Sequence, residues 1–208
     1  MNTKDDIKEY FIELEDDDIK VREAARWQLA SLGPAAIPDL VHQLKTDKEP
    51  CRREAAQILG EIHDESAVDD LVEALLDDSI GVEWAASEAL IKYGPSGILP
   101  LLEGVTRHFD SARFRRGAFH VLHTLKDLHG LHSKVQKVLD ALHSMEPRAS
   151  VAWAAERAIE QLRFGSWAPT APVEHTLHHV CDVFNEVDRP YILEVMYGYF
   201  ASTNKNSR

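Results

Sequence analysis

A pattern of apolar residues that recurs about every 30 residues is the feature that most constrains the fold of this chain. Residues 17–44 show it as two segments with apolar side chains at helical spacing, joined by Gly33 and Pro34. This spacing, close to 100° per residue, predicts two amphipathic α-helices. Gly33 is a good helix terminator, and Pro34 cannot prolong the first helix. We therefore predict a helical hairpin with one buried side.

The same hairpin pattern occurs in further copies. The apolar stripe of each first helix begins at positions 21, 51, 82, 114 and 151, and that of each second helix at positions 7, 37, 68, 98 and 135. An alanine stands four positions after the start of every first-helix stripe, and its small side chain allows neighbouring helices to approach closely. A repeat of this length indicates stacked helix pairs. The sequence thus predicts an all-α solenoid of stacked antiparallel helix pairs, with about twelve helices.

The copies divide the chain into four parts. We expect a repeat solenoid over residues 1–163, opened by the second helix of an incomplete repeat that forms an N-terminal cap, because Ile7 begins a second-helix stripe. The sequence FGSWAPTAP predicts a linker or long loop at 164–172. The apolar stripe resumes after it, so we expect C-terminal helices that complete and cap the solenoid over 173–200, followed by a flexible tail at 201–208.

Charge and composition narrow the classes of partner. The formal net charge of −12 over 208 residues disfavours nucleic-acid binding, which needs clustered positive charge, and favours basic partners. No signal-peptide pattern is visible, and no apolar run reaches the length of a membrane span. Cys51 and Cys181 lie on apolar stripes, so we predict buried thiols in a reducing compartment. The expected location is cytoplasmic.

Aspartate and arginine residues recur beside the stripes. An aspartate stands four residues before the start of the stripe as Asp17, Asp47, Asp78 and Asp110, and an arginine stands one residue after it as Arg22, Arg52 and Arg115. The D-x-x-x-V-R-x-x-A-x-x-x-L pattern resembles the HEAT-like repeats of the bilin-lyase type, the PBS-lyase HEAT-like repeat family, over roughly residues 5–162. The resemblance implies a right-handed superhelix of antiparallel helix pairs. It also implies that these side chains form a structural ladder between neighbouring repeats.

Ordinary side-chain chemistry is compatible with this ladder. An aspartate just before a helix can cap its free N–H groups, and a guanidinium can reach a carboxylate of the adjacent repeat. The sequence departs from the pattern at Glu83, which replaces the arginine, and at Pro147 and Ala152, which replace the last aspartate and arginine. We infer either that those repeats stack differently or that Glu83 faces a partner.

The family that the chain resembles includes bilin lyases, an iron-dependent deoxyhypusine hydroxylase and many scaffold or adaptor proteins. The hydroxylase type uses His-Glu dipeptides as iron ligands, and this sequence contains none. Another HEAT-like group acts on alkylated DNA, which requires a basic concave face that the charge of this chain disfavours. Scaffolds and bilin lyases are therefore the candidates that remain.

The second helices are expected to line the concave groove of such a solenoid, where solenoids bind partners. Their outward positions form a mostly acidic partner-binding groove that consists of Asp39, His42, Gln43, Asp70, Glu73 and Glu103. An acidic strip suits a basic or extended segment of a partner protein. A solvated polar face also explains these residues.

Two other groups of residues are candidates for contacts. Trp84 lies on a first helix away from the strict stripe, where it either fills a gap between repeats or offers an aromatic contact to a partner. The i, i+4, i+7 spacing of His175, His179 and Asp182 lets these side chains converge on one transition-metal ion, although an exposed polar face explains them too. The aromatic C-terminal helix either packs on the last repeat or forms a homodimer contact.

These patterns favour a non-catalytic protein-binding scaffold or adaptor, with no cofactor, whose acidic groove holds a basic protein or peptide segment. The alternative is a bilin or tetrapyrrole lyase-like, or chaperone-like, protein that handles a prosthetic group. A weaker alternative is metal binding through the His-rich C-terminal helix. The sequence contains no nucleophile elbow, phosphate loop or zinc-finger spacing, and it does not determine the oligomeric state.

Overall fold

The computed structural model describes residues 3–129, 132–143 and 148–164, and within them the regular structure is entirely helical, as the sequence predicts. The chain divides into two compact units, Met1–Arg163 and Phe164–Arg208. Nearly all of the second unit lies outside the described residues. The linker, the C-terminal helices, the flexible tail and the homodimer contact therefore stay predictions.

The described residues contain ten α-helices and four short 3-10 segments. The α-helices are α1 (Thr3–Glu13), α2 (Ile19–Ser31), α3 (Ile37–Gln43), α4 (Glu49–Ile62), α5 (Val68–Glu73), α6 (Ile80–Tyr93), α7 (Ile98–Arg107), α8 (Ala112–His129), α9 (His132–His143) and α10 (Arg148–Phe164). The 3-10 segments are η1 (Gly33–Ala36), η2 (Glu65–Ala67), η3 (Ala74–Leu76) and η4 (Gly94–Gly97).

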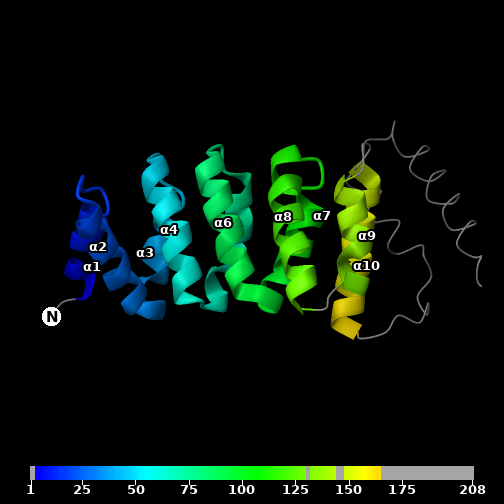
Figure 1. The fold of residues 1–208 in the computed structure, drawn as a ribbon, viewed down its shortest axis with the longest axis horizontal. Coiled ribbons are helices and arrows are strands. Elements are labelled where there is room, and N and C mark those ends of the chain that lie inside the picture. Colours follow the sequence, from blue (N-terminus) through cyan, green and yellow to red (C-terminus); the bar gives the residue numbers. More distant parts are fainter. Residues whose placement is uncertain (1–2, 130–131, 144–147, 165–208) are drawn as a thin grey trace, which may run out of the picture. The chain divides into compact units, whose positions relative to one another are not determined.

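These helices stand side by side in a row, from α1 and α2 at one end to α9 and α10 at the other (Figure 1). Successive first helices pack on one another, α2 on α4, α4 on α6 and α6 on α8, while the second helix α5 packs on α7. Helices adjacent in the chain also pack together, as α1 does on α2 and α8 on α9. The repeated helix pairs are thus present, whereas the handedness of the superhelix and the total number of helices stay predictions.

The repeated apolar positions form the core. The alanines four positions after each stripe start are all at most 1% exposed, namely Ala25, Ala55, Ala86, Ala118 and Ala155. Their small side chains permit close contact between successive first helices. Between α4 and α6 this contact is so tight that a Cβ added to Gly60 would lie 2.8 Å from both Cα and Cβ of Ala89. A larger side chain at Gly60 would therefore push these helices apart.

A left-handed backbone residue follows three of the first helices at the same place in the repeat. Gly33 and Gly94 have φ of 58°, and His63 has φ of 56°. Glycine adopts this conformation without steric cost, which explains why α2 ends before Gly33 as predicted. His63 adopts the same backbone conformation although its side chain makes that conformation unfavourable, and its ring also contacts the next repeat. Its ring stacks on Tyr93 with the ring centroids 4.8 Å apart.

Cys51 lies in the first turn of α4, and the prediction that its thiol is buried in the core is wrong. The residue is half-buried because it lies at the edge of the core, and its Sγ donates to Glu15 Oε1 at 3.3 Å. Lys48 Nζ binds the same carboxylate at 2.8 Å. Burial and then the Glu15 carboxylate raise the pKa of the Cys51 thiol. Since the thiolate is the nucleophilic form, this environment disfavours reaction at Cys51. Cys181 lies outside the described residues.

Candidate binding surfaces

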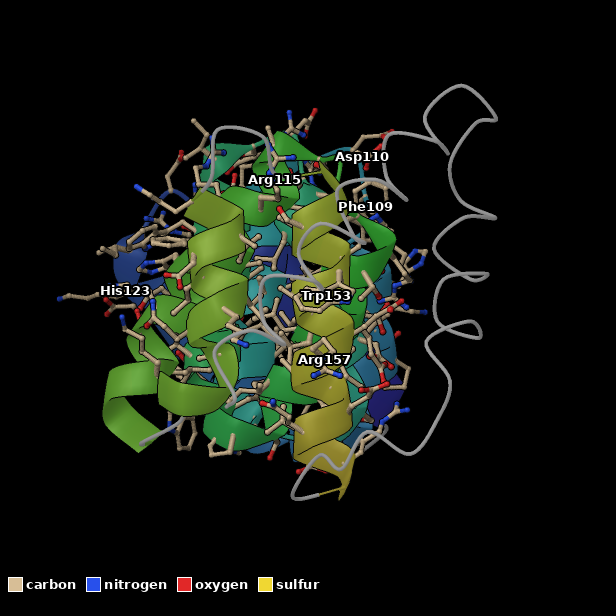
Figure 2. The ribbon with its side chains drawn as sticks, turned by 90° about the vertical axis from the view of Figure 1, so that its right-hand side faces the viewer. Phe109, Asp110, Arg115, His123, Trp153 and Arg157 are labelled. Carbon is tan, nitrogen blue, oxygen red and sulfur yellow. The ribbon has the colours of Figure 1, made fainter. Side chains whose placement is uncertain are left out.

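The three predicted ladder arginines share a local contact. Each guanidinium donates through Nη1 to the backbone carbonyl six residues earlier, with Arg22 bonded to Asp16 at 2.6 Å, Arg52 to Thr46 at 3.0 Å and Arg115 to Phe109 at 2.9 Å. Two of them also donate to the carbonyl oxygens of Asp17 and Asp47. Figure 2 shows Arg115, Phe109 and Asp110 in the same part of the view. These arginines hold the loop that precedes their own helix.

Arg52 also reaches the next repeat. Its Nε and Nη2 donate to the two carboxylate oxygens of Asp77 at 2.7 and 2.9 Å, and Nη2 also donates to Asp78 at 2.9 Å. The side chains of Arg52 and Asp77 are 12% and 10% exposed. Burial raises the pKa of Asp77, but hydrogen bonds from Arg52 and from the Ser79 N–H outweigh it and bring this pKa below its usual value. The main partner of Arg52 is therefore Asp77, which sequence reasoning missed.

Helix capping falls one residue later than the predicted aspartates. The N-cap of α2 is Asp18, whose side chain accepts a hydrogen bond from the Lys20 N–H at 2.9 Å. The N-cap of α6 is Ser79, whose hydroxyl accepts from the Gly81 N–H at 3.2 Å. The capping role suggested for Asp17 and Asp78 is therefore wrong, because an N-cap side chain must immediately precede the first helical residue.

The acidic residues of the predicted groove come from three successive second helices, and we name Asp39, Asp70, Glu73 and Glu103 the acidic face. On α3, Asp39 and His42 are exposed and Gln43 is half-buried. The other three carboxylates each pair with a basic group of the same chain, with Lys45 3.0 Å from Asp70, Arg107 3.1 Å from Glu73, and Arg163 2.6 Å from Glu103. His108 also lies 3.2 Å from Glu73. The negative charge of the acidic face is thus partly balanced within the chain.

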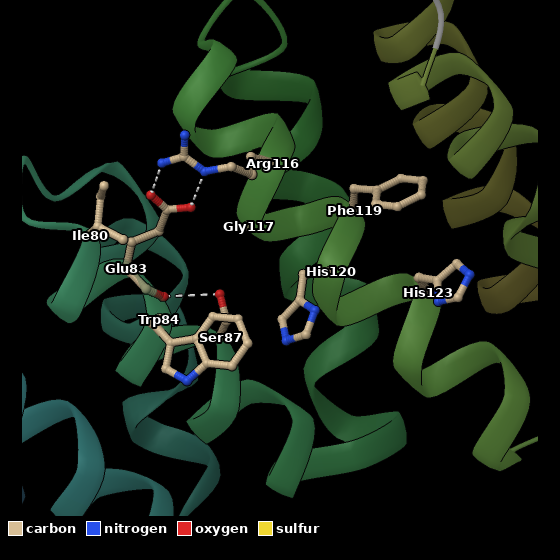
Figure 3. Close-up of a pocket in the computed structure, with 9 residues that line it drawn as sticks. All are labelled: Ile80, Glu83, Trp84, Ser87, Arg116, Gly117, Phe119, His120 and His123. Atoms are coloured by element: carbon tan, nitrogen blue, oxygen red, sulfur yellow. Dashed lines mark hydrogen bonds and ion pairs between the residues drawn. The ribbon is translucent and has the colours of Figure 1, made fainter.

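A depression of about 400 Å³ lies between the first helices α6 and α8. We name it the α6–α8 depression, and Figure 3 shows its lining, which consists of Ile80, Glu83, Trp84 and Ser87 from α6 and Arg116, Gly117, Phe119, His120 and His123 from α8. Ile80 and Trp84, one helical turn apart, are 73% and 58% exposed. The depression therefore combines exposed apolar surface with basic side chains.

The interpretation that Glu83 faces a partner is wrong, because Glu83 is only 5% exposed and binds within the chain. Its carboxylate accepts a hydrogen bond from Arg116 Nε at 2.9 Å and a second one from Arg116 Nη2. Figure 3 shows this two-bond pair at one side of the α6–α8 depression. The hydrogen bonds to Glu83 raise the pKa of Arg116. Glu83 thus links α6 to α8, much as Glu54 links α4 to Arg26 of α2 at 2.6 Å.

Trp84 is 58% exposed, and its ring contacts the next repeat. The indole stacks on His120 with the ring centroids 4.7 Å apart and the ring planes 25° from parallel. His120 Nε2 in turn lies 3.2 Å from Glu88 Oε1. Trp153 on α10, labelled in Figure 2, is half-buried and lies under Arg157, whose guanidinium carbon is 5.7 Å from the ring centroid. Trp84 is more exposed than Trp153, and its role as an aromatic contact to a partner stays a prediction.

The part of the chain that the structure describes contains no group of three His, Cys, Asp or Glu side chains that could hold a metal ion. The predicted ligands His175, His179 and Asp182 lie outside that part. Among the helices of the described residues, none has both the length and the apolar character needed to cross a membrane.

A comparison with known families gives a match to HEAT repeats. The family model of HEAT repeats matches residues 8–91, which run from α1 into α6. This range includes three aspartates and two arginines of the ladder pattern, namely Asp17, Asp47, Asp78, Arg22 and Arg52. No curated protein sequence matches the chain significantly. The match supports a HEAT-like repeat protein and leaves the narrower resemblance to the bilin-lyase type as a prediction.

Proposed function

We propose that the protein is a non-catalytic scaffold or adaptor whose acidic face holds a basic, extended segment of a partner protein. HEAT repeats commonly serve as protein-interaction scaffolds, and residues 8–91 match that family. The single observation that carries the proposal concerns the carboxylates on consecutive second helices. They lie at the surface, and three of them already form ion pairs with lysine or arginine side chains of the chain itself.

The basic groups that occupy the acidic face now are Lys45, Arg107 and Arg163, and all three have mostly exposed side chains. Exposed ion pairs of this kind contribute about 0–1 kcal/mol each. A partner arginine or lysine could therefore replace them at little cost. Asp39, which is exposed on α3, extends the same face by one repeat.

The test is charge reversal with a matched control. Asp70→Lys combined with Glu73→Lys changes two members of the acidic face, and Glu65→Lys with Asp69→Lys makes the same change of net charge at exposed residues of the same repeat outside that face. The probe is a fluorescein-labelled 12-residue peptide of alternating arginine and serine, followed by fluorescence anisotropy at low salt.

We expect the face variant to weaken peptide binding about tenfold, because two attractions become repulsions worth together about 1–2 kcal/mol. The control should change binding much less, and the thermal midpoint of either variant should fall by less than about 4 °C. Equal losses in both variants would mean that the peptide senses net charge alone, and the acidic face would then not be the binding site.

The tetrapyrrole alternative has a separate test. Incubation of the purified protein with biliverdin should leave the visible spectrum of the pigment unchanged if the protein is a scaffold. A shifted and intensified absorption band that travels with the protein through gel filtration would favour a lyase-like or chaperone-like role instead.

A further inference from the structure

The ion pair between Arg163 and Glu103 differs in origin from the other ion pairs of the acidic face. Lys45 follows the end of α3 and Arg107 ends α7, so both basic groups come from the row of second helices themselves. Arg163 instead lies in the last turn of α10, 60 positions after Glu103, and its Nη2 donates to Glu103 Oε1 at 2.6 Å. It is also the last residue of the first compact unit. The C-terminal end of that unit therefore supplies a basic group to the acidic face.

The backbone at Glu103 is held firmly by the packing of α7. The next residue is Gly104, and a Cβ added to it would lie 2.6 Å from Cγ1 of Val72 on α5 and 2.7 Å from Cζ of Phe114 on α8. Only glycine permits this close approach of three helices. The Glu103 side chain is nevertheless 39% exposed. A basic group that arrives from solvent therefore finds this carboxylate accessible and already in place.

The ion pair with Glu103 is not needed to hold α10 in the fold. Val151, Ala155 and Ala158 of this helix are each at most 2% exposed, and burial of such apolar side chains fastens the helix to the core. The Arg163 side chain is 51% exposed, and exposed ion pairs contribute little to stability. Because the arginine side chain is long and has several rotatable bonds, its guanidinium can turn into water while α10 stays in place.

We propose that Arg163 is an autoinhibitory residue of the acidic face, whose guanidinium must leave Glu103 before an arginine or lysine of a partner binds there. This inference rests on the proposed function and adds a regulatory contact to it. Arg163 presents the same group as a partner arginine, and two cations at one carboxylate repel each other. The apparent affinity for the partner is therefore reduced by the fraction of molecules in which Glu103 is already occupied.

The experiment measures binding of the same labelled peptide of alternating arginine and serine by fluorescence anisotropy at low salt. The proteins are wild type, Arg163→Ala, Glu103→Gln and the variant that carries both changes. Arg53→Ala is the matched control, because it also removes one positive charge from an ion pair at the surface. Arg53 pairs with Glu49 on the first helix α4, and their side chains are 40% and 35% exposed. Urea unfolding followed by circular dichroism reports the stability of each variant.

We expect Arg163→Ala to bind the peptide about three- to fivefold more tightly than wild type, which is the range that release of an exposed ion pair allows. Arg53→Ala should change binding less than about 1.5-fold, because its charge lies outside the acidic face and is screened by solvent. When Glu103 is already glutamine, Arg163→Ala should have no further effect, since no carboxylate is left to release.

Equal gains in Arg163→Ala and Arg53→Ala would overturn the proposal, because net charge alone would explain them. A loss of stability in Arg163→Ala without tighter binding would also overturn it, since the ion pair would then be a structural link. The variant that combines Asp70→Lys with Glu73→Lys tests the proposed function separately. If that variant weakens binding while Arg163→Ala leaves it unchanged, the acidic face is retained and autoinhibition is rejected. Absence of peptide binding to both wild type and Arg163→Ala would reject both proposals.

Discussion

Replacement of Arg52 by alanine should destabilise the fold more than the same change at Arg22, although both arginines occupy the same position of the repeat. Arg52 binds two loop carbonyls and, across the repeat boundary, both carboxylate oxygens of Asp77. Arg22 binds two loop carbonyls only among the hydrogen bonds of the described residues. The difference between the two variants isolates the inter-repeat pair.

The magnitude follows from burial. Removal of one partner from a fully buried ion pair costs about 3–5 kcal/mol, because the other charge is left without compensation. Arg52 and Asp77 are 12% and 10% exposed, so water reaches their edges and the lower end of that range applies. We expect Arg52→Ala to lower the free energy of unfolding by about 3 kcal/mol, and Arg22→Ala, which loses exposed hydrogen bonds, by about 1 kcal/mol.

The assay is urea unfolding followed by circular dichroism at neutral pH, with Asp77→Asn as a third variant. The double variant combines Arg52→Ala with Asp77→Asn. If Arg52 acts through Asp77, this double variant should lose clearly less stability than the sum of the two single losses, because the two side chains stabilise the fold together. Equal losses for Arg52→Ala and Arg22→Ala would refute the reasoning, since only the loop contacts would then matter.

The same pair predicts a dependence on pH. The pKa of Asp77 in the folded protein lies below its usual value, so its contribution is complete above the unfolded-state pKa of about 3.9 and is lost as the pH falls through the lower folded pKa. Between pH 7 and pH 3 wild type should therefore lose more stability than Asp77→Asn. A parallel loss in both proteins would show that Asp77 does not contribute to acid sensitivity.

Three further substitutions test the repeat frame. Gly33→Ala should cost about 1 kcal/mol by urea unfolding, purely from backbone strain, because φ is 58° and nothing lies within 4 Å of the added methyl group. Gly97→Ala, where φ is −77°, is its control and should cost less. Tyr93→Phe should cost about 1–2 kcal/mol, because two carbonyl oxygens of the preceding repeat, 3.0 and 2.9 Å from the phenol, lose their donor. Burial raises the pKa of Tyr93 to about 12, so the phenol remains a donor over the whole neutral range and its ionisation at 295 nm should appear only near that pH. Gly60→Ala should cost about 1–3 kcal/mol in thermal melts from overpacking against Ala89, and no loss would show that α4 and α6 separate freely.

Much of the fold was determined by local sequence. The stripe spacing, the alanine four positions on and Gly33 each act within one or two turns of helix, so they predict helices, buried faces and helix ends from neighbours in the chain. The repetition of these signals then predicts that the pairs stack, because each unit has an apolar side that another copy must cover. The HEAT match over residues 8–91 agrees with that prediction.

Only the tertiary structure decided which polar side chains meet. Glu83 lies 33 positions from Arg116, and Asp77 lies 25 positions from Arg52, so each pair depends on how far one helix is rotated and shifted against the next. The apolar stripe does not specify this rotation, because the apolar side stays buried when the rotation of a helix changes slightly. For the same reason, three carboxylates of the acidic face, Asp70, Glu73 and Glu103, looked unpaired in the sequence but lie next to basic groups from outside their own helices. The sequence determined the repeated frame, and the stacking of that frame decided which charges remain available to a partner.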